Sequence, residues 1–151
     1  MTTEIDKRIL EFIREHHVLT LATSDEGRPW CSSMFYVFIE EEQLFVFTSE
    51  DKTRHIAEAR KNYRVAGSIA LETKIVGRIR GIQFCGEIFQ PDGELLAVAK
   101  KMYLKRFPIA HLSTLHLWVV SPDLIKMTDN RLGFGKKLYW ERGKSSGEIC
   151  G

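Results

Sequence analysis

A stretch of nine residues, FTSEDKTRH (47–55), places cations at the expected start of a helix. Its basic residues are Lys52, Arg54 and His55, although the unpaired N–H groups at a helix N-terminus already make that end electropositive. A bound dianion would resolve this conflict, because Lys52 and Arg54 would then pair with it. Three hydroxyls in the same stretch could donate to that anion, those of Thr48, Ser49 and Thr53. The alternative is a solvated turn, partly neutralised by Glu50 and Asp51, in which Arg54 meets Glu58 at i,i+4.

No other pattern predicts a nucleophile, a general base or a metal site. LGFGKK (132–137) and GRIRG (77–81) lack the phosphate-loop and dinucleotide fingerprints, and GxSxG is absent. The histidines show no metal-ligand spacing, and the three cysteines are scattered, with Cys31 and Cys85 in apolar runs where we expect core packing. If the protein carries out chemistry, we therefore expect a cofactor to supply it.

A second candidate element is WCSSMFYVFI (30–39), which reads as one strand. Strand alternation predicts two faces: one with Trp30, Ser32, Met34 and Tyr36, and the other with Cys31, Ser33 and Phe35. This mixture of flat apolar and small polar groups suits either a packed barrel strand or a wall that lies along a planar ring.

The elements that would position these residues follow from hydrophobic periodicity. Helices are predicted at 3–16, with Thr2 or Thr3 as cap, at 53–62 and at 93–107. Strands are predicted at 17–24, 30–39, 43–48, 64–71, 75–89, 115–120, 123–129 and 136–141, with a break at Ser121-Pro122 and glycine bulges at 77, 81 and 86. Because strands follow one another without regular helices between them, we expect a mainly β fold: an antiparallel barrel with peripheral helices, rather than a doubly wound parallel sheet.

Composition limits the class of protein. The 151 residues fit a single domain (1–151), with 44% hydrophobic and 28% charged residues. A net charge of +2 with interleaved acids and bases does not indicate a nucleic-acid partner. The charged, amphipathic N-terminus lacks a signal-peptide pattern, and no apolar run has transmembrane length, so we expect no membrane partner and a cytoplasmic location.

The segment LATSDEGRPWCSSMFYVFIEEEQLFVFTSEDKTRHIAEARKNYRVAGSIA (21–70) resembles the core of the pyridoxamine 5′-phosphate oxidase superfamily of FMN-binding split barrels. RFPIAH and TDNRLGFGKKLYWERG extend the resemblance over nearly the whole chain and make it closest to the YhbP-like branch. The resemblance implies a split antiparallel β-barrel, a homodimer, and FMN at the subunit interface.

The same resemblance assigns candidate cofactor residues. The phosphate loop falls on Thr48, Ser49, Lys52, Thr53 and Arg54, and the flavin-lining strand on Trp30 to Met34, including Ser32 and Ser33. Gly81 stands where a flavin-contacting glutamine is often found, and Gln83 lies two residues further on. Lys136 aligns with an arginine on the flavin side.

The alignment also shows a departure at the substrate site. Leu132 and Phe134 occupy the positions of the Arg and His that grip substrate in the true oxidases. Neither side chain can donate to a substrate phosphate, so we do not expect pyridoxamine phosphate oxidation.

Several functions remain open at this point. The first is an FMN-dependent oxidoreductase that acts on an unidentified small molecule, with a pterin or deazaflavin cofactor as a variant. Rivals are a haem-binding split barrel, with His55, His111 or His116 as axial ligand, and a non-catalytic binding module that has lost its cofactor. Whether the protein is an enzyme stays undecided by sequence.

Overall fold

The computed structural model describes residues 4–143. Eight antiparallel strands form one sheet in the order β2-β1-β5-β6-β7-β4-β3, and β8 pairs with β7. The strands are β1 (Val18–Asp25), β2 (Arg28–Phe35), β3 (Val37–Ile39), β4 (Leu44–Thr48), β5 (Arg64–Ala70), β6 (Arg80–Phe89), β7 (Leu117–Asp129) and β8 (Lys137–Glu141). The helices are α1 (Lys7–Glu15), α2 (Arg54–Lys61) and α3 (Gly93–Arg106), with short 3-10 turns η1 (Val76–Arg78), η2 (Pro108–Leu112) and η3 (Asn130–Leu132).

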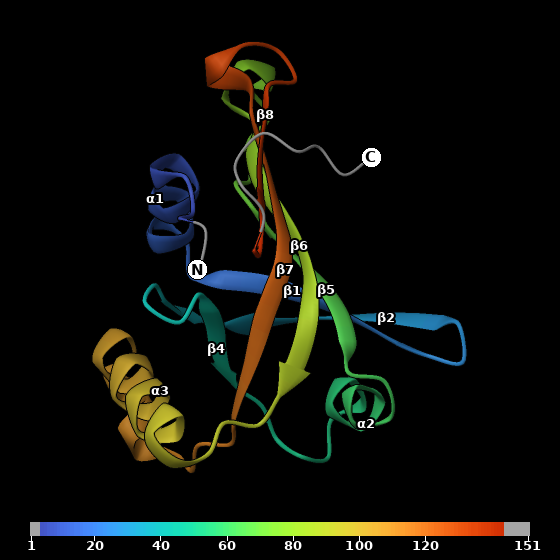
Figure 1. Cartoon of the computed structure of the whole chain (residues 1–151), viewed down its shortest axis with the longest axis vertical. Coiled ribbons are helices and arrows are strands. Elements are labelled where there is room, and N and C mark those ends of the chain that lie inside the picture. The colour runs from blue at the N-terminus through green and yellow to red at the C-terminus, as the bar shows by residue number, and fades with distance from the viewer. Residues whose placement is uncertain (1–3, 144–151) are drawn as a thin grey trace.

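The sheet curls into a half-barrel; α2 and α3 lie at its lower end, and α1 lies higher, to one side of the strands (Figure 1). The upper parts of β6, β7 and β8 rise above α2 and α3 as an arm, with η1 and η3 at its tip, and Glu15 of α1 pairs with Arg80 of β6. The core fills the inner face of the sheet with aliphatic and aromatic side chains, among them Leu19, Phe45, Ile69, Phe84 and Val120. The expected mainly β split barrel is therefore confirmed.

Helix α1 begins at Lys7, later than the predicted start at residue 3, because Asp6 caps its N-terminus. The Asp6 side chain accepts a hydrogen bond from the Arg8 N–H at 2.8 Å, which satisfies one unpaired donor of the first turn. The predicted caps Thr2 and Thr3 lie outside the described residues, and Asp6 holds the cap position. Ile9, Phe12 and Ile13 form the buried stripe, as their spacing predicts.

The predicted strand 30–39 is two strands, β2 and β3, separated at Tyr36. The Tyr36 ring is fully buried, and its hydroxyl donates to the Ile13 carbonyl of α1 at 2.6 Å. Burial raises the pKa of Tyr36 well above its usual value, so the phenol stays a donor. The chain thus turns at Tyr36 to fix α1 against the sheet.

The predicted break at Ser121-Pro122 is wrong, because β7 runs through both residues. Opposite them, the β6–β7 register shifts between Cys85 and Gly86, so that Asp123 is the extra residue of a bulge. Proline cannot donate an N–H to a regular strand ladder, and it is tolerated here because the bulge interrupts that ladder. A Cβ at Gly86 would lie 2.1 Å from the Ser121 carbonyl oxygen, so this crossing requires glycine.

Within residues 4–143, every helix is too short or too polar to cross a lipid bilayer.

Candidate functional site

The basic stretch 47–55 forms a tight turn that leads into α2. Thr53 caps the helix: its hydroxyl accepts from the Ile56 N–H at 3.4 Å and donates to the Glu50 carbonyl at 2.9 Å. The first-turn N–H groups of Arg54 and His55 have no intrahelical acceptor, because the helix begins there. The predicted helix start is therefore confirmed. The free N–H groups lie at the end of α2 that adjoins the loop.

Hydroxyl and imidazole groups crowd beside this helix start. Nε2 of His55 lies 2.5 Å from the Ser49 hydroxyl and 3.3 Å from that of Thr53. Burial lowers the pKa of His55, and the nearby Glu58 carboxylate opposes that effect only in part. A neutral His55 accepts from Ser49 or donates to it, so the imidazole fixes the position of this hydroxyl.

Thr48 is the last residue of β4, and it joins the loop to β7. Its hydroxyl oxygen accepts from the His116 N–H at 3.0 Å, while the Ser49 N–H donates to the His116 carbonyl at 2.9 Å. The loop is thus anchored at both ends, by β7 on one side and by the α2 cap on the other.

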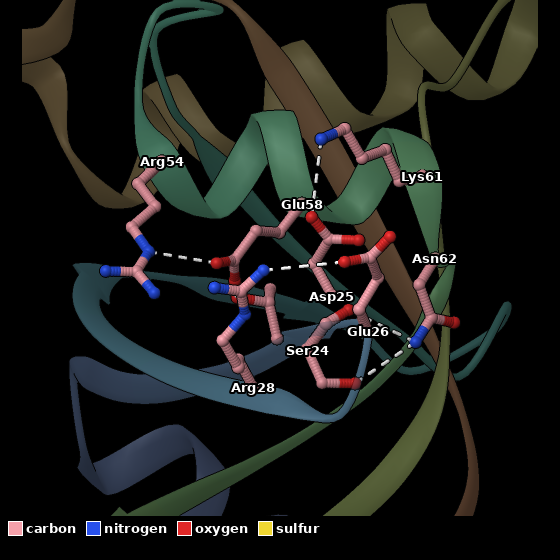
Figure 2. A network of polar contacts seen from close by, with 9 residues as sticks. Ser24, Asp25, Glu26, Arg28, Arg54, Glu58, Lys61 and Asn62 are labelled. Atoms are coloured by element: carbon pink, nitrogen blue, oxygen red, sulfur yellow. Dashed lines mark hydrogen bonds and ion pairs between the residues drawn. The ribbon is translucent and has the colours of Figure 1, made fainter.

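The cations of the loop have different surroundings. Arg54 donates through Nε to the Glu58 carboxylate at 2.9 Å, as the i,i+4 spacing predicts, and Figure 2 shows the two side chains directed toward each other. The Arg54 guanidinium also lies over the Trp30 ring, 4.0 Å from its centroid. Lys52 is exposed and has no carboxylate within 4.0 Å among residues 4–143. Lys52 is therefore the cation that a ligand would meet without displacing an ion pair.

Glu58 is the buried charge at the centre of this arrangement. It is 7% exposed, and Thr23 of β1 donates its hydroxyl proton to Oε2 at 2.6 Å. Hydrogen bonds from Thr23 and from Arg54 hold the pKa of Glu58 below its usual range. The carboxylate therefore stays ionised and remains the partner of Arg54.

Strand β2 lies at the edge of the sheet with both faces largely open. Its register with β1 places Trp30 opposite Thr23, Ser32 opposite Leu21 and Met34 opposite Leu19, so these three residues line the inner face as predicted. Met34 packs against the core, while the Ser32 hydroxyl is buried without a hydrogen-bond partner among the described residues. Trp30 is 43% exposed.

The other face of β2 corrects one expectation. Cys31 is exposed and Cys85 is half-buried, so the prediction that both cysteines pack in the core is wrong. Cys31 lies in the edge strand β2, most of whose side chains are exposed. Cys150 lies outside the described residues.

Three further predicted residues, Ser33, Gln83 and Lys136, do not lie with the loop and the inner face of β2. Ser33 and Gln83 share the outer face, in the cross-strand row Ser33–Thr20–Ser68–Gln83, which spans about 14 Å over three strand spacings. Lys136 lies at the arm tip, between η3 and β8, whereas α2 lies at the opposite end of the molecule (Figure 1). One chain therefore brings together the loop and the inner face of β2, but not Gln83 or Lys136.

The arm tip also carries Leu132 and Phe134, the residues that the resemblance aligns with the substrate pair of the oxidases. Phe134 is 87% exposed and Leu132 is partly exposed. Ile75, Val76 and Ile79 of the neighbouring loop are exposed beside them, held by the Asn130 side chain, which donates to the Val76 carbonyl at 2.8 Å. The tip is thus apolar with flanking cations, and it presents no polar pair for a substrate phosphate.

A cavity of about 400 Å³ opens elsewhere, between α1, β3 and α3. Three of its polar side chains are engaged with one another or with backbone: Arg14 pairs with Glu40, and Arg106 donates to the Tyr36 and Arg14 carbonyls. No group of three or more His, Cys, Asp or Glu residues within 4–143 is placed to hold a metal ion.

The sequence predicts Glu58 only as a partner of Arg54 in a solvated turn, and it gives no signal for Thr23. The i,i+4 spacing identifies the first contact. The second joins β1 to α2 across 35 residues, and no local pattern predicts it.

Comparison with known proteins connects this geometry to a family. The family model described as pyridoxamine 5′-phosphate oxidase matches residues 5–116. The UPF0306 protein YhbP of Escherichia coli O157:H7 is 41% identical over 138 residues, which cover 91% of this chain and 94% of that protein.

Solved structures share the fold at lower identity. A heme binding protein from Mycobacterium smegmatis superposes with a TM-score of 0.73 and 21% identity, over 86% of this chain and 55% of that chain. HutZ, a heme storage protein from Vibrio cholerae, has a TM-score of 0.66 and 22% identity, over 94% and 97% of the two chains. An FAD-binding protein from Mesorhizobium loti has a TM-score of 0.65 and 11% identity, over 82% and 93%. The fold thus occurs in proteins named for haem and for flavin.

Proposed function

This chain belongs to the pyridoxamine 5′-phosphate oxidase family and to its UPF0306 group, and from that premise we propose that it binds FMN and uses it to oxidise or reduce a small molecule. The observation that carries the proposal is Lys52, a cation without an ion pair in the described chain, beside the open N–H groups of α2. A phosphate monoester is a dianion, and it matches both features.

The residues of the loop would divide the binding of the phosphate among them. Lys52 supplies positive charge, and the N–H groups of Arg54 and His55 donate along the helix axis. Ser49 donates its hydroxyl proton when the His55 Nε2–H donates to the Ser49 oxygen. The Thr53 hydroxyl contributes less than the sequence predicts, because its proton already goes to the Glu50 carbonyl. Thr48 serves mainly to hold the loop against β7.

Strand β2 would supply the wall for the ring. Trp30 offers an indole face, Met34 an apolar surface, and Ser32 a hydroxyl that lacks a partner in the described chain. When bound, the flavin supplies the redox chemistry. The residues of the protein would bind the ring, orient it and limit the access of water.

The site proposed here needs a second copy of the chain. Gln83 and Lys136 lie far from the loop of their own chain, so they contribute to a cofactor site only if a homodimer places them against the loop of its partner. The exposed edge strand β2 and the exposed arm tip support this assembly, because both leave apolar side chains uncovered.

The proposal excludes pyridoxamine phosphate as substrate. Leu132 and Phe134 provide no donors for a substrate phosphate, and both are exposed at the arm tip, where a partner chain or substrate would meet them. The small molecule that is transformed stays unassigned.

The test is an absorbance spectrum of the purified protein, followed by FMN titration of the wild type and of a Lys52→Ala/Arg54→Ala variant. We expect a flavin spectrum, or saturable FMN binding at micromolar concentration, and clearly weaker binding by the variant. Colourless protein that does not bind added FMN would refute the proposal and favour a non-catalytic interaction module.

Haem binding is the second candidate, and the two structural neighbours named for haem favour it. Of the three candidate axial ligands, His55 already contacts Ser49 and Thr53 through Nε2, whereas His111 is exposed and His116 is half-buried beside the loop. A Soret band after haem addition, lost in His116→Ala or His111→Ala and unaffected by FMN, would favour haem over flavin.

A further inference from the structure

Four residues from three elements form a closed chain of contacts beside the loop. Thr23 of β1 donates to Glu58 of α2 at 2.6 Å, Glu58 accepts from Arg54 at 2.9 Å, and Arg54 lies over Trp30 of β2 at 4.0 Å. Trp30 is opposite Thr23 in the β1–β2 register, which closes the chain. Figure 2 shows Arg54 and Glu58 within the larger polar network between α2 and the β1–β2 turn.

Each contact restricts the next. The two carboxylate oxygens of Glu58 accept from different donors, so the carboxylate cannot rotate without losing one of them. Arg54 is held through Nε, which leaves the flat face of its guanidinium against the indole. Arg54 therefore covers one face of the Trp30 ring, and Trp30 remains 43% exposed.

The ion pairs of this region separate the two loop cations. The charge of Arg54 is balanced by Glu58, and Asp51 of the loop pairs with Arg60 at 3.0 Å. Neither Glu50 nor Asp51 lies within 4.0 Å of the Lys52 ammonium, since no such ion pair occurs among residues 4–143. A phosphate could therefore pair with Lys52 without displacing a carboxylate, whereas Arg54 is already paired with Glu58.

We infer that Glu58 is a positioning residue that commits Arg54 to the ring side of the site, where it orients Trp30, and leaves the phosphate to Lys52 and the α2 N–H groups. This inference rests on the proposed flavin site and refines it, because the sequence alone assigns Arg54 to the phosphate. Arg54 and Trp30 then act together as a platform for the planar ring, and Thr23 holds the platform through Glu58.

Riboflavin, which has the ring but no phosphate, separates the two roles. Each variant is titrated with FMN and with riboflavin. The affinity for FMN divided by the affinity for riboflavin is a ratio that reports on the phosphate alone. We expect Lys52→Ala to lower the ratio, because only FMN binding weakens. We expect Arg54→Ala and Glu58→Gln to weaken both ligands by a similar factor, about three- to tenfold, with the ratio unchanged within about twofold. Glu42→Gln, which changes an exposed glutamate in the β3–β4 turn, is the matched control and should match the wild type.

A second readout needs no ligand. The indole N–H resonances of Trp30, Trp118 and Trp140 can be assigned with Trp30→Phe, and only Trp30 is exposed. We expect Glu58→Gln and Arg54→Ala to shift the Trp30 resonance while the two buried indoles stay in place. Unchanged buried resonances also show that the variant is folded.

The outcomes distinguish this inference from the function on which it rests. If the wild type binds neither flavin, the proposed function fails, and the Trp30 resonance still reports whether Glu58 positions the indole. If the wild type binds FMN but Arg54→Ala lowers the ratio as Lys52→Ala does, with riboflavin binding and the Trp30 resonance unchanged, the inference is overturned and Arg54 serves the phosphate.

Discussion

The crossing of β6 and β7 at Gly86 predicts a large and local effect of a single methyl group. Gly86→Ala places a Cβ 2.1 Å from the Ser121 carbonyl oxygen and 2.8 Å from the Pro122 Cα, both of which are backbone atoms. A side chain could rotate away, but these atoms can move only if the bulge shifts. Overpacking of this kind costs about 1–3 kcal/mol, and we expect the upper end because the contact is with backbone.

A loss of about 3 kcal/mol corresponds to a fall in Tm of about 6–12 °C for a chain of this size. Thermal unfolding followed by circular dichroism would measure it. Gly81→Ala is the matched control in the same strand, since the nearest atom to its added Cβ is the Ile69 carbonyl oxygen at an ordinary 3.4 Å. We expect its Tm to stay close to that of the wild type. Equal Tm values for wild type and Gly86→Ala would refute the assigned register and bulge.

Three further predictions concern packing, protonation and exposure. Arg106→Met should lower the free energy of unfolding by about 2–3 kcal/mol in urea titrations, because three backbone carbonyls lose their common donor; an unchanged midpoint would contradict the contacts. Burial lowers the pKa of His55, so the unfolded chain binds the proton more readily and wild-type stability should fall as the pH drops from the unfolded pKa near 6.5 to the lower folded pKa. His55→Gln should reduce that dependence in urea midpoints measured at several pH values, and an identical dependence would exclude His55 as its source. In a Cys150→Ser variant, Ellman's reagent should modify Cys31 faster than Cys85, because Cys31 is exposed and Cys85 half-buried; the reverse order would contradict the open face of β2.

The general fold was predictable because its signals are local. Alternation of apolar residues located most strands, and the 3.6-residue stripe of Ile9, Phe12 and Ile13 located α1. The helix start near Thr53 followed from the sequence pattern, and the structure caps the helix with Thr53. The split-barrel topology itself came from the resemblance to the family, since pattern alone gave only an antiparallel barrel.

The predictions that the structure contradicts share a physical cause, because each depends on contact between distant parts of the chain. Ser121-Pro122 looks like a break because proline interrupts most strands, and only its partner Gly86 makes a bulge there. Cys31 lies in an apolar run, but burial depends on tertiary contacts, and most side chains of the edge strand β2 are exposed. The strand break at Tyr36 likewise depends on its hydroxyl reaching Ile13 of α1.

The candidate site was predicted in part for the same reason. Residues close in sequence, such as Ser49, Lys52 and Arg54, were found from their spacing. Glu58 acquires its role only through Thr23 of another strand, so its burial could not be read from the helix alone. The placement of Gln83 and Lys136 depends on a second chain and stays a prediction.

The most direct test of the account is the affinity of the wild type and of Lys52→Ala for FMN and for riboflavin, measured by quenching of flavin fluorescence. A charge-assisted contact to the phosphate contributes about 1.5–3 kcal/mol, so Lys52→Ala should weaken FMN binding by about ten- to a hundredfold. Riboflavin binding should be unchanged, because riboflavin has no phosphate. Equal affinity of both proteins for FMN, or an equal loss for FMN and riboflavin, would contradict the claim that this loop holds a phosphate.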